Sequence, residues 1–303
     1  MIETKEITKK FDGFTAVNKL SCHIPDGSIY GMVGSNGAGK STFLRMITGI
    51  FKPDEGEVLV DGENIFDNDK MKSRMIFVPD ELYFLNGASL EKMADFYRDI
   101  YKTFDMDFFR SLVKEFDLPM KKAIDRFSKG MKRQSSIILG LSIKPDYYIF
   151  DETFDGLDPI VRNHVKSIIC KEVEASKSTA IITSHSLREM ENLCDQLAFL
   201  HKGGLILEND VCNLKTSLFK VQLAFERGIE EVELKDCDIL EKVKTGSVIS
   251  IIARGDANAV EAQIKNMPTL FYDMLPLTLE EIFTYEMSAL GYCFDEGKEG
   301  EAV

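Results

Sequence analysis

The sequence has no run of apolar residues long enough to cross a membrane. Its longest apolar stretches, such as residues 247–253, have the length of buried strands. The first six residues include no apolar signal region, and nothing in them suggests export. Hydrophobic residues make up 44% and charged residues 29% of the 303 positions. This composition is typical of a globular protein with room for two domains.

Cysteine is scarce, and no two cysteines form a C-x-x-C pair. Scattered single cysteines exclude a disulfide framework and a zinc site built from closely spaced thiols, and they indicate reduced thiols in a cytoplasm. The six residues are Cys22, Cys170, Cys194, Cys212, Cys237 and Cys293.

Basic residues are fewer than acidic ones, 37 against 50, and the formal net charge is −13. Because the phosphate backbone of a nucleic acid would be repelled, we expect no nucleic-acid partner. Residues 129–133 nevertheless form a local basic patch. The acidic segment 295–303 is expected to be frayed.

Residues 34–41 carry the most informative pattern, Gly-Ser-Asn-Gly-Ala-Gly-Lys-Ser, which matches G-x-x-x-x-G-K-[ST]. A short apolar stretch at 28–33 precedes it, and residues 41–48 follow with apolar side chains at helical spacing. Between a strand and a helix, such a loop directs backbone N–H groups and a helix N-terminus at an anion. The alternative, an ordinary glycine-rich turn, is disfavoured by the motifs further along the chain.

The polar residues of this loop have separate expected roles. Lys40 is predicted to bridge the β- and γ-phosphates of a nucleotide, Ser41 to ligate Mg²⁺ and Thr42 to help hold the α-phosphate. The residues predicted to bind nucleotide from this loop are Gly34, Ser35, Asn36, Gly37, Ala38, Gly39, Lys40, Ser41 and Thr42.

Two acidic residues, Asp151 and Glu152, directly follow the apolar stretch 147–150. At the end of a strand beside a phosphate loop, Asp151 can orient Mg²⁺ through its water shell. Glu152 is then placed to accept a proton from an attacking water. Taken alone, such a pair would be read as a helix cap or a solvated strand edge, but the phosphate loop favours the catalytic interpretation.

Changes in pattern along the chain predict its organisation. Residues 1 to about 85 are β-rich with one helix, and residues 86–142 form an inserted helical layer. Apolar strands at 147–150 and 180–183 indicate a parallel sheet buried on both faces. A hairpin around residues 202–204 closes the first domain near residue 215. Residues 216–303 then form a small α+β accessory domain whose last helix opens with a capping box at 278–281.

The order of these motifs resembles the ATP-binding subunit of an ABC transporter. The resemblance rests on the phosphate loop, on residues 127–131 at the start of a helix, on Asp151 and Glu152, on residues 155–159 and on residues 183–185. It covers residues 1 to about 215. It implies an α/β fold: a P-loop NTPase core with an antiparallel β subdomain and an inserted α-helical subdomain, followed here by the small C-terminal α+β domain. It also implies ATP and Mg as the cofactors.

The same resemblance assigns functions around one nucleotide. Phe11 corresponds to the aromatic residue that stacks on adenine, and Val17 to a residue lining the same pocket. His185 resembles the switch histidine that contacts the γ-phosphate, although an isolated histidine would be read as structural. The implied catalytic residues are therefore Glu152, His185 and Lys40.

In this family two ATP-binding domains face each other head to tail, and ATP closes the dimer. Ser128 and Gly130 would then approach the partner's triphosphate at a helix N-terminus. Asp158 resembles the residue that couples the two sites. The second ATP-binding subunit can be identical or different, giving a homodimer or a heterodimer.

Several positions depart from the family pattern. The usual Leu-Ser-Gly-Gly-Gln signature is replaced by Phe127-Ser-Lys-Gly-Met131, in which Lys129 is either a surface charge or a cation near the γ-phosphate. Asp80 stands where a glutamine usually ligates Mg²⁺, and it is either an anionic Mg²⁺ ligand or a turn residue after proline. Thr153 replaces a proline common after the acidic pair.

The leading hypothesis is a cytoplasmic ATPase subunit that powers an exporter, peripheral on the inner face of the cell membrane through a separate transmembrane subunit. Residues 128–131, 79–81 and 278–283 resemble a branch of bacterial exporter ATPases for drugs, antimicrobial peptides or lipids. The alternative is an ABC-type ATPase that acts as a nucleotide-dependent clamp or regulator without a transporter. A small-molecule kinase sharing the phosphate loop is disfavoured by the signature helix and His185.

Overall fold

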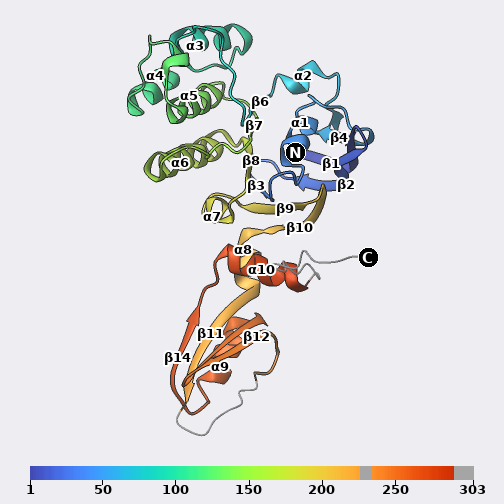
Figure 1. Ribbon diagram of the computed structural model, residues 1–303, viewed down its shortest axis with the longest axis vertical. Helices are drawn as coiled ribbons and strands as arrows, with labels where there is room; N and C mark the ends of the chain where they lie inside the picture. The colour runs from blue at the N-terminus through green and yellow to red at the C-terminus, as the bar shows by residue number, and fades with distance from the viewer. Residues whose placement is uncertain (226–233, 290–303) are drawn as a thin grey trace, which may run out of the picture. The chain divides into compact units, whose positions relative to one another are not determined.

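The computed structural model describes residues 1–225 and 234–289. Its chain divides into two compact units, Met1–Asn209 and Asp210–Val303, whose elements are labelled in Figure 1. The predicted frayed segment 295–303 and Cys293 lie outside the described residues.

A four-stranded antiparallel sheet opens the first unit, with the order β2-β1-β4-β5. It contains β1 (Ile2–Phe11), β2 (Phe14–Ile24), β4 (Glu55–Val60) and β5 (Glu63–Asn64). The turn between β4 and β5 has φ values of 51° at Asp61 and 81° at Gly62. Both angles are left-handed, as a two-residue Asp-Gly turn requires.

A six-stranded sheet lies at the centre of this unit, with the order β10-β9-β3-β8-β7-β6. Neighbouring strands pair in parallel from β9 through β3, β8 and β7 to β6. Every residue of β3, β7 and β8 is buried, so the predicted parallel sheet with two covered faces is confirmed. The strands are β3 (Ile29–Val33), β6 (Met75–Val78), β7 (Tyr147–Phe150), β8 (Thr179–Ser184), β9 (Gln196–His201) and β10 (Gly204–Asp210).

Helices cover both faces of the central sheet (Figure 1). Helix α1 (Lys40–Ile47) shares one core with the antiparallel sheet and with the inward side chains of the central strands. Helix α6 (Pro159–Ser176) lies on the other side together with a helical layer. That layer consists of α3 (Leu90–Ile100), α4 (Met106–Glu115), η1 (Ile124–Arg126) and α5 (Lys129–Ser142); two short helices are α2 (Asp69–Lys72) and α7 (Leu187–Met190).

Polar caps begin the helices of the helical layer. Ser89 accepts a hydrogen bond from the N–H of Lys92, Asp105 from that of Phe108, and Ser128 from that of Met131. Each cap satisfies a backbone donor that has no partner within its own helix. The helix starts are therefore set by local sequence.

The second unit is a four-stranded antiparallel sheet with the order β12-β13-β11-β14. Alternate residues of β11 and β13, such as Val221 and Ile251, pack with Val260 and Ile264 of α9. The predicted capping box is confirmed, because Thr278 and Glu281 each accept a hydrogen bond from the other's backbone N–H. The elements are α8 (Val211–Ser217), β11 (Leu218–Phe225), β12 (Cys237–Thr245), β13 (Val248–Gly255), α9 (Ala257–Ile264), β14 (Thr269–Leu275) and α10 (Leu279–Ala289).

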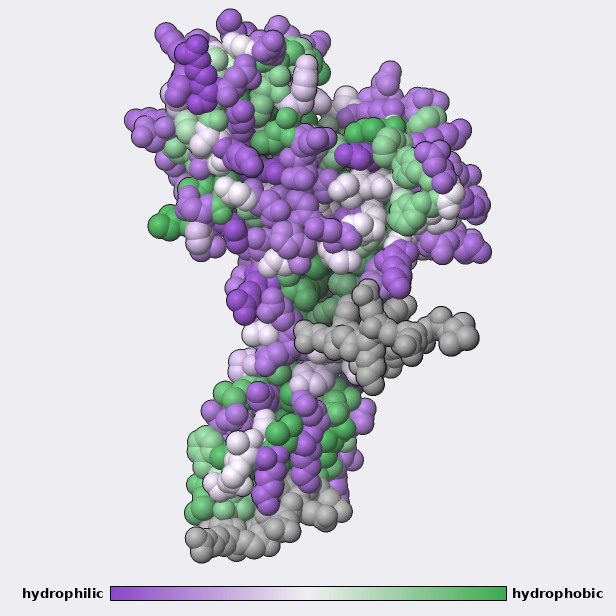
Figure 2. Space-filling view, viewed as in Figure 1, coloured by the Kyte–Doolittle hydropathy of each residue, from purple (hydrophilic) through white to green (hydrophobic). Residues whose placement is uncertain are grey.

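Polar residues dominate the face of the first unit seen in Figure 2, with smaller groups of apolar residues between them. Among the described residues, no helix combines the length and the apolar character needed to cross a bilayer.

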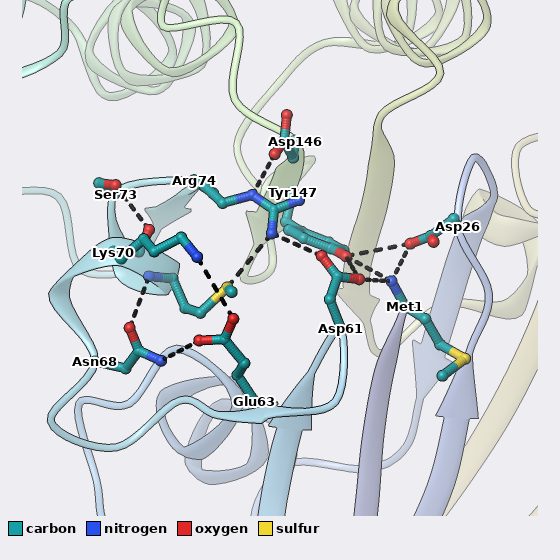
Figure 3. Close-up of polar contacts among 11 residues, drawn as sticks. Met1, Asp26, Asp61, Glu63, Asn68, Lys70, Ser73, Arg74, Asp146 and Tyr147 are labelled. Atoms are coloured by element: carbon teal, nitrogen blue, oxygen red, sulfur yellow. Dashed lines mark hydrogen bonds and ion pairs between the residues drawn. The ribbon is translucent and has the colours of Figure 1, made fainter.

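A polar cluster joins the two sheets of the first unit (Figure 3). Arg74 donates to Asp61 at 2.7 Å and to Asp146 at 2.5 Å. The hydroxyl of Tyr147, the first residue of β7, donates to Asp61 at 2.8 Å, as does the amino group of Met1 at 2.7 Å. Partial burial acts to raise the pKa of the Asp61 carboxyl, but these hydrogen bonds outweigh burial and lower the pKa to about 2.

We expect Asp61→Asn to reduce the free energy of unfolding at neutral pH by about 1–2 kcal/mol, because a carboxyl whose pKa falls on folding stabilises the charged native state. The lowered pKa means that this stabilisation is present above about pH 4 and is lost as the pH falls toward 2. Urea unfolding of both proteins at a series of pH values from 7 down to 2.5 measures the difference. A difference in the free energy of unfolding that stays constant or grows on acidification would contradict a stabilising role for the charged Asp61 carboxylate.

Candidate active site

The loop between β3 and α1 is held by close backbone contacts that exclude side chains. A Cβ atom at Gly34 would lie 2.4 Å from the carbonyl oxygen of Leu200, and one at Gly39 would lie 2.4 Å from that of Ala16. Gly39 also has a φ of 103°, and Gly37 has a φ of 80°. Glycine is required at such angles and at such approaches, so these three glycines determine the shape of the loop.

Lys40, the first residue of α1, folds back over this loop. Its Nζ atom donates to the carbonyl oxygens of Gly34 at 2.6 Å and Ser35 at 3.3 Å. The same atom lies 3.0 Å from Oε1 of Glu152. Because the Lys40 side chain is only 5% exposed, these contacts compensate a charge that is almost fully removed from water.

Thr183 connects the two acidic residues that follow β7. Its hydroxyl donates to Asp151 at 2.7 Å and accepts from the backbone N–H of Glu152 at 3.0 Å. Asp151 is buried, and Glu152 has a left-handed φ of 45°. Sequence reasoning assigned no role to Thr183; its place at the end of the neighbouring strand, two residues before His185, was the available signal.

His185 lies opposite Glu152. Its Nδ1 atom is 3.1 Å from Oε2 of Glu152 and 3.8 Å from Oδ2 of Asp155. Burial raises the pKa of the Asp155 carboxyl, and the nearby Glu152 adds to that shift while His185 opposes it. Ligand atoms of these three residues lie within 4.8 Å of one another, so two carboxylates and an imidazole converge at one point beside the phosphate loop.

A cleft of about 430 Å³ brings the loop and this cluster together. Of the residues predicted to contact nucleotide or metal, the loop from Asn36 to Thr42 lines it, together with Glu152, His185 and Asp80. The remaining lining residues are Phe14, Ala16 and Asp155.

The two residues expected around adenine do not line this cleft. The ring of Phe11 packs edge-on against Phe51, with 5.6 Å between ring centroids, and Val17 is fully buried in the core close to Gly39. Phe14, which is 63% exposed, is the aromatic residue in the lining. Sequence reasoning did not single it out, although it stands only three residues after Phe11.

Asp80 lies in the cleft but already has a partner. Its Oδ1 atom accepts a hydrogen bond of 2.6 Å from Arg133 of α5, which also donates to the carbonyl of Pro79 at 3.2 Å. Arg133 is buried, so this ion pair attaches the segment after β6 to the helical layer.

The residues expected to act on a partner's nucleotide lie at helix N-termini outside this cleft. Ser128 is exposed at the start of α5. Asp158 begins α6 by accepting hydrogen bonds of 3.1 Å from the N–H groups of Ile160 and Val161. A Cβ atom at Gly130 would lie 3.4 Å from the carbonyl oxygen of Gly156, which places the start of α5 beside residues 155–158.

Comparison with known proteins identifies the family to which this chain belongs. The family model described as ABC transporter matches residues 17–155. The chain is 33% identical over 219 residues to the bacitracin transport ATP-binding protein BcrA of Bacillus licheniformis, covering 71% of each chain. It is 29% identical over 283 residues to the ABC transporter ATP-binding protein YtrB of Bacillus subtilis, covering 93% of this chain and 97% of that relative.

Solved structures confirm the predicted α/β P-loop NTPase fold. An ATP-binding subunit of an ABC transporter superimposes with a TM-score of 0.65 at 23% identity, over 71% of this chain and 92% of that one. A dimeric ATP-binding cassette bound to ADP and Pi superimposes with a TM-score of 0.63 at 20% identity, over 70% of this chain and 99% of that one. With a phosphate loop, the glutamate that follows β7 and a histidine meeting in one cleft, the chain belongs to the family of ABC transporter ATP-binding proteins.

Proposed function

We propose that this chain is the ATP-hydrolysing subunit of a membrane exporter and that it works through head-to-tail dimerisation driven by ATP. One observation carries the proposal. Lys40 of the phosphate loop, Glu152 after β7 and His185 after β8 meet through contacts of 3.0 and 3.1 Å. A phosphate-binding cation, a carboxylate base and a histidine are thus in reach of one reacting phosphate.

The triphosphate would lie across the loop at the N-terminus of α1. Backbone N–H groups of residues 36–42 and the positive end of the helix dipole stabilise anionic oxygens there. Of the two aromatic residues flanking the β1–β2 turn, Phe14 already lines the cleft, while Phe11 would have to act from its position against Phe51.

The residues predicted to hold Mg²⁺ provide the oxygen ligands that this ion prefers, namely the hydroxyl of Ser41 and the carboxylates of Asp151 and Asp80. Asp151 is buried and is oriented by Thr183, which fits a rigid second-sphere or direct ligand. Asp80 lines the cleft but shares its charge with Arg133. Bound Mg²⁺ would neutralise charge on the β- and γ-phosphates.

Glu152 is the proposed general base. In this structure one of its oxygens pairs with Lys40 and the other with His185, so each oxygen already has a partner that competes with a proton from water. A β,γ-phosphate competes for the charge of Lys40, and His185 has the γ-phosphate as an alternative partner. ATP binding would therefore release the carboxylate that hydrolysis needs.

Closure of two subunits explains the placement of the remaining predicted residues. Ser128 and Gly130 lie at a helix N-terminus away from the chain's own phosphate loop, as expected of groups that contact ATP bound to a second subunit. Asp158 begins the helix next to them. The partner ATP-binding subunit is either a copy of this chain or a relative, and a separate transmembrane subunit would place the pair at the inner face of the membrane.

The names of relatives support an export role. The matched proteins include bacitracin transport, lantibiotic transport and linearmycin resistance ATP-binding proteins. We therefore propose an antimicrobial peptide, drug or lipid as the cargo, with residues 216–303 as an accessory domain. A nucleotide-dependent clamp without a transporter is the competing function, and co-purification with a membrane protein would exclude it.

Replacing Glu152 with Gln should preserve ATP binding and reduce turnover by at least about 100-fold, because the side chain keeps its shape and loses its basicity. Phosphate release measures turnover, and nucleotide titration measures binding. Glu57→Gln is the matched control, since it removes an exposed carboxylate paired with Lys5 and should change neither quantity. Near-normal turnover in Glu152→Gln would contradict the assignment.

The Glu152→Gln protein should be a monomer without nucleotide and a dimer with Mg-ATP, because uncleaved ATP remains between the two subunits. Light scattering measures the solution mass in both conditions. Adding Ser128→Arg, which places a bulky charge at the start of α5, should prevent the dimer. A mass that does not respond to Mg-ATP would overturn nucleotide-driven dimerisation of this chain.

Asp80→Ala should raise the Mg²⁺ concentration needed for half-maximal turnover by about tenfold if Asp80 is a metal ligand. The Asp80→Asn protein should need a Mg²⁺ concentration between those of the wild-type and Asp80→Ala proteins, because an amide oxygen is a weaker ligand for a hard cation. A Mg²⁺ titration of the three proteins decides the point. Unchanged curves would leave Asp80 with its structural role as the partner of Arg133 alone.

A further inference from the structure

Four residues after His185, the buried carboxylate of Glu189 holds the backbone around His185 in place. Glu189 of α7 is 7% exposed, and its Oε2 atom accepts a hydrogen bond of 2.6 Å from the hydroxyl of Ser184. The same hydroxyl accepts from the backbone N–H of Ser186 at 3.0 Å. The residues on both sides of His185 are therefore tied, through one hydroxyl, to the Glu189 carboxylate.

The other oxygen of Glu189 reaches a different element. Its Oε1 atom lies 2.9 Å from Nη1 of Arg162 on α6. Arg162 in turn donates from Nη2 to the carbonyl of Leu157 at 3.2 Å. Leu157 belongs to the loop that runs from the catalytic Glu152 to Asp158, so two hydrogen bonds and one ion pair connect that loop to the segment around His185.

A second connection runs in parallel one helical turn along α6. Lys166 donates to the backbone carbonyl of Glu189, and its ammonium lies 5.2 Å from the ring centroid of Phe154. Phe154 is buried in the same loop, two residues after Glu152. Arg162 and Lys166 of α6 thus both bridge α7 and the loop.

The ion pair between Glu189 and Arg162 fixes the positions of α7 and α6 more than it adds to the free energy of folding. The Nε atom of Arg162 is buried and has no hydrogen-bond partner among the described residues, which costs stability in any folded protein. A buried ion pair is weakly stabilising at best, but breaking it leaves an uncompensated charge. Each end of this pair is therefore held in one position relative to the other.

We propose that Glu189 and Arg162 are positioning residues that couple His185 to the 155–158 loop. They would transmit the state of the γ-phosphate at His185 to the loop that faces the second subunit, and they would keep His185 at its distance from Glu152. This inference rests on the proposed ATPase function and identifies part of its regulation. Neither residue lines the phosphate cleft, so both act through their neighbours.

The test compares Glu189→Gln, Arg162→Gln and the double variant in the full-length chain. Each single variant should lower kcat roughly 10- to 100-fold, because small misplacements of catalytic groups have effects of this size, while KM for ATP and nucleotide affinity stay within about twofold. The double variant should lower kcat by no more than the more impaired single variant does, since each substitution breaks the same coupling. Arg110→Gln, which breaks an exposed ion pair on α4, should leave kcat unchanged.

Thermal unfolding separates this role from a purely structural one. If the folded variants melt earlier but keep the wild-type kcat, the pair only attaches α6 to α7 and the proposal is wrong. Should Glu189→Gln fail to fold, Ser184→Ala decides, because it cuts the link to His185 and leaves the ion pair intact: a lower kcat supports the coupling, and an unchanged kcat overturns it. A wild-type chain with no ATPase turnover would instead contradict the proposed function.

Discussion

Parallel pairing of β8 with both β3 and β7 is the constraint on which the site depends. The carboxyl ends of parallel neighbours meet at one edge of a sheet. The phosphate loop leaves β3 there, the acidic pair leaves β7, and His185 follows β8. Residues separated by more than a hundred positions in the sequence are thereby held within hydrogen-bonding distance before any ligand arrives.

Charge balance in the cleft follows from this convergence. A buried lysine and a largely buried glutamate would each be unfavourable alone, and Lys40 and Glu152 compensate each other at 3.0 Å. The pairing that stabilises the folded chain also occupies the proposed base. Under the proposed function, binding of a polyanion and activation of the base would be two consequences of one exchange of partners at Lys40.

The loop from Glu152 to Asp158 connects the chemistry to the rest of the molecule. It carries the proposed base at one end and begins α6 at the other, and it contacts the start of α5 at Gly130. Arg162 and Lys166 of α6 contact the loop and Glu189 of α7. Under the proposed coupling, a change at the nucleotide would reach the surface that faces a second subunit without any large rearrangement of the core.

Local signals in the sequence determined the phosphate loop, the strand and helix types and the helix caps, because each depends on neighbours within a few residues. The glycines at 34, 37 and 39 and the capping box at 278–281 are examples. The acidic pair and His185 could be assigned because they belong to family motifs, and their convergence follows from parallel strand order.

Only the tertiary structure decided which partner each polar group takes. Thr183 between Asp151 and Glu152, Arg133 on Asp80, Phe14 in the cleft and Arg162 on Glu189 are contacts between residues far apart in the sequence. Such contacts depend on how buried charges are matched in space, which no spacing along the chain encodes.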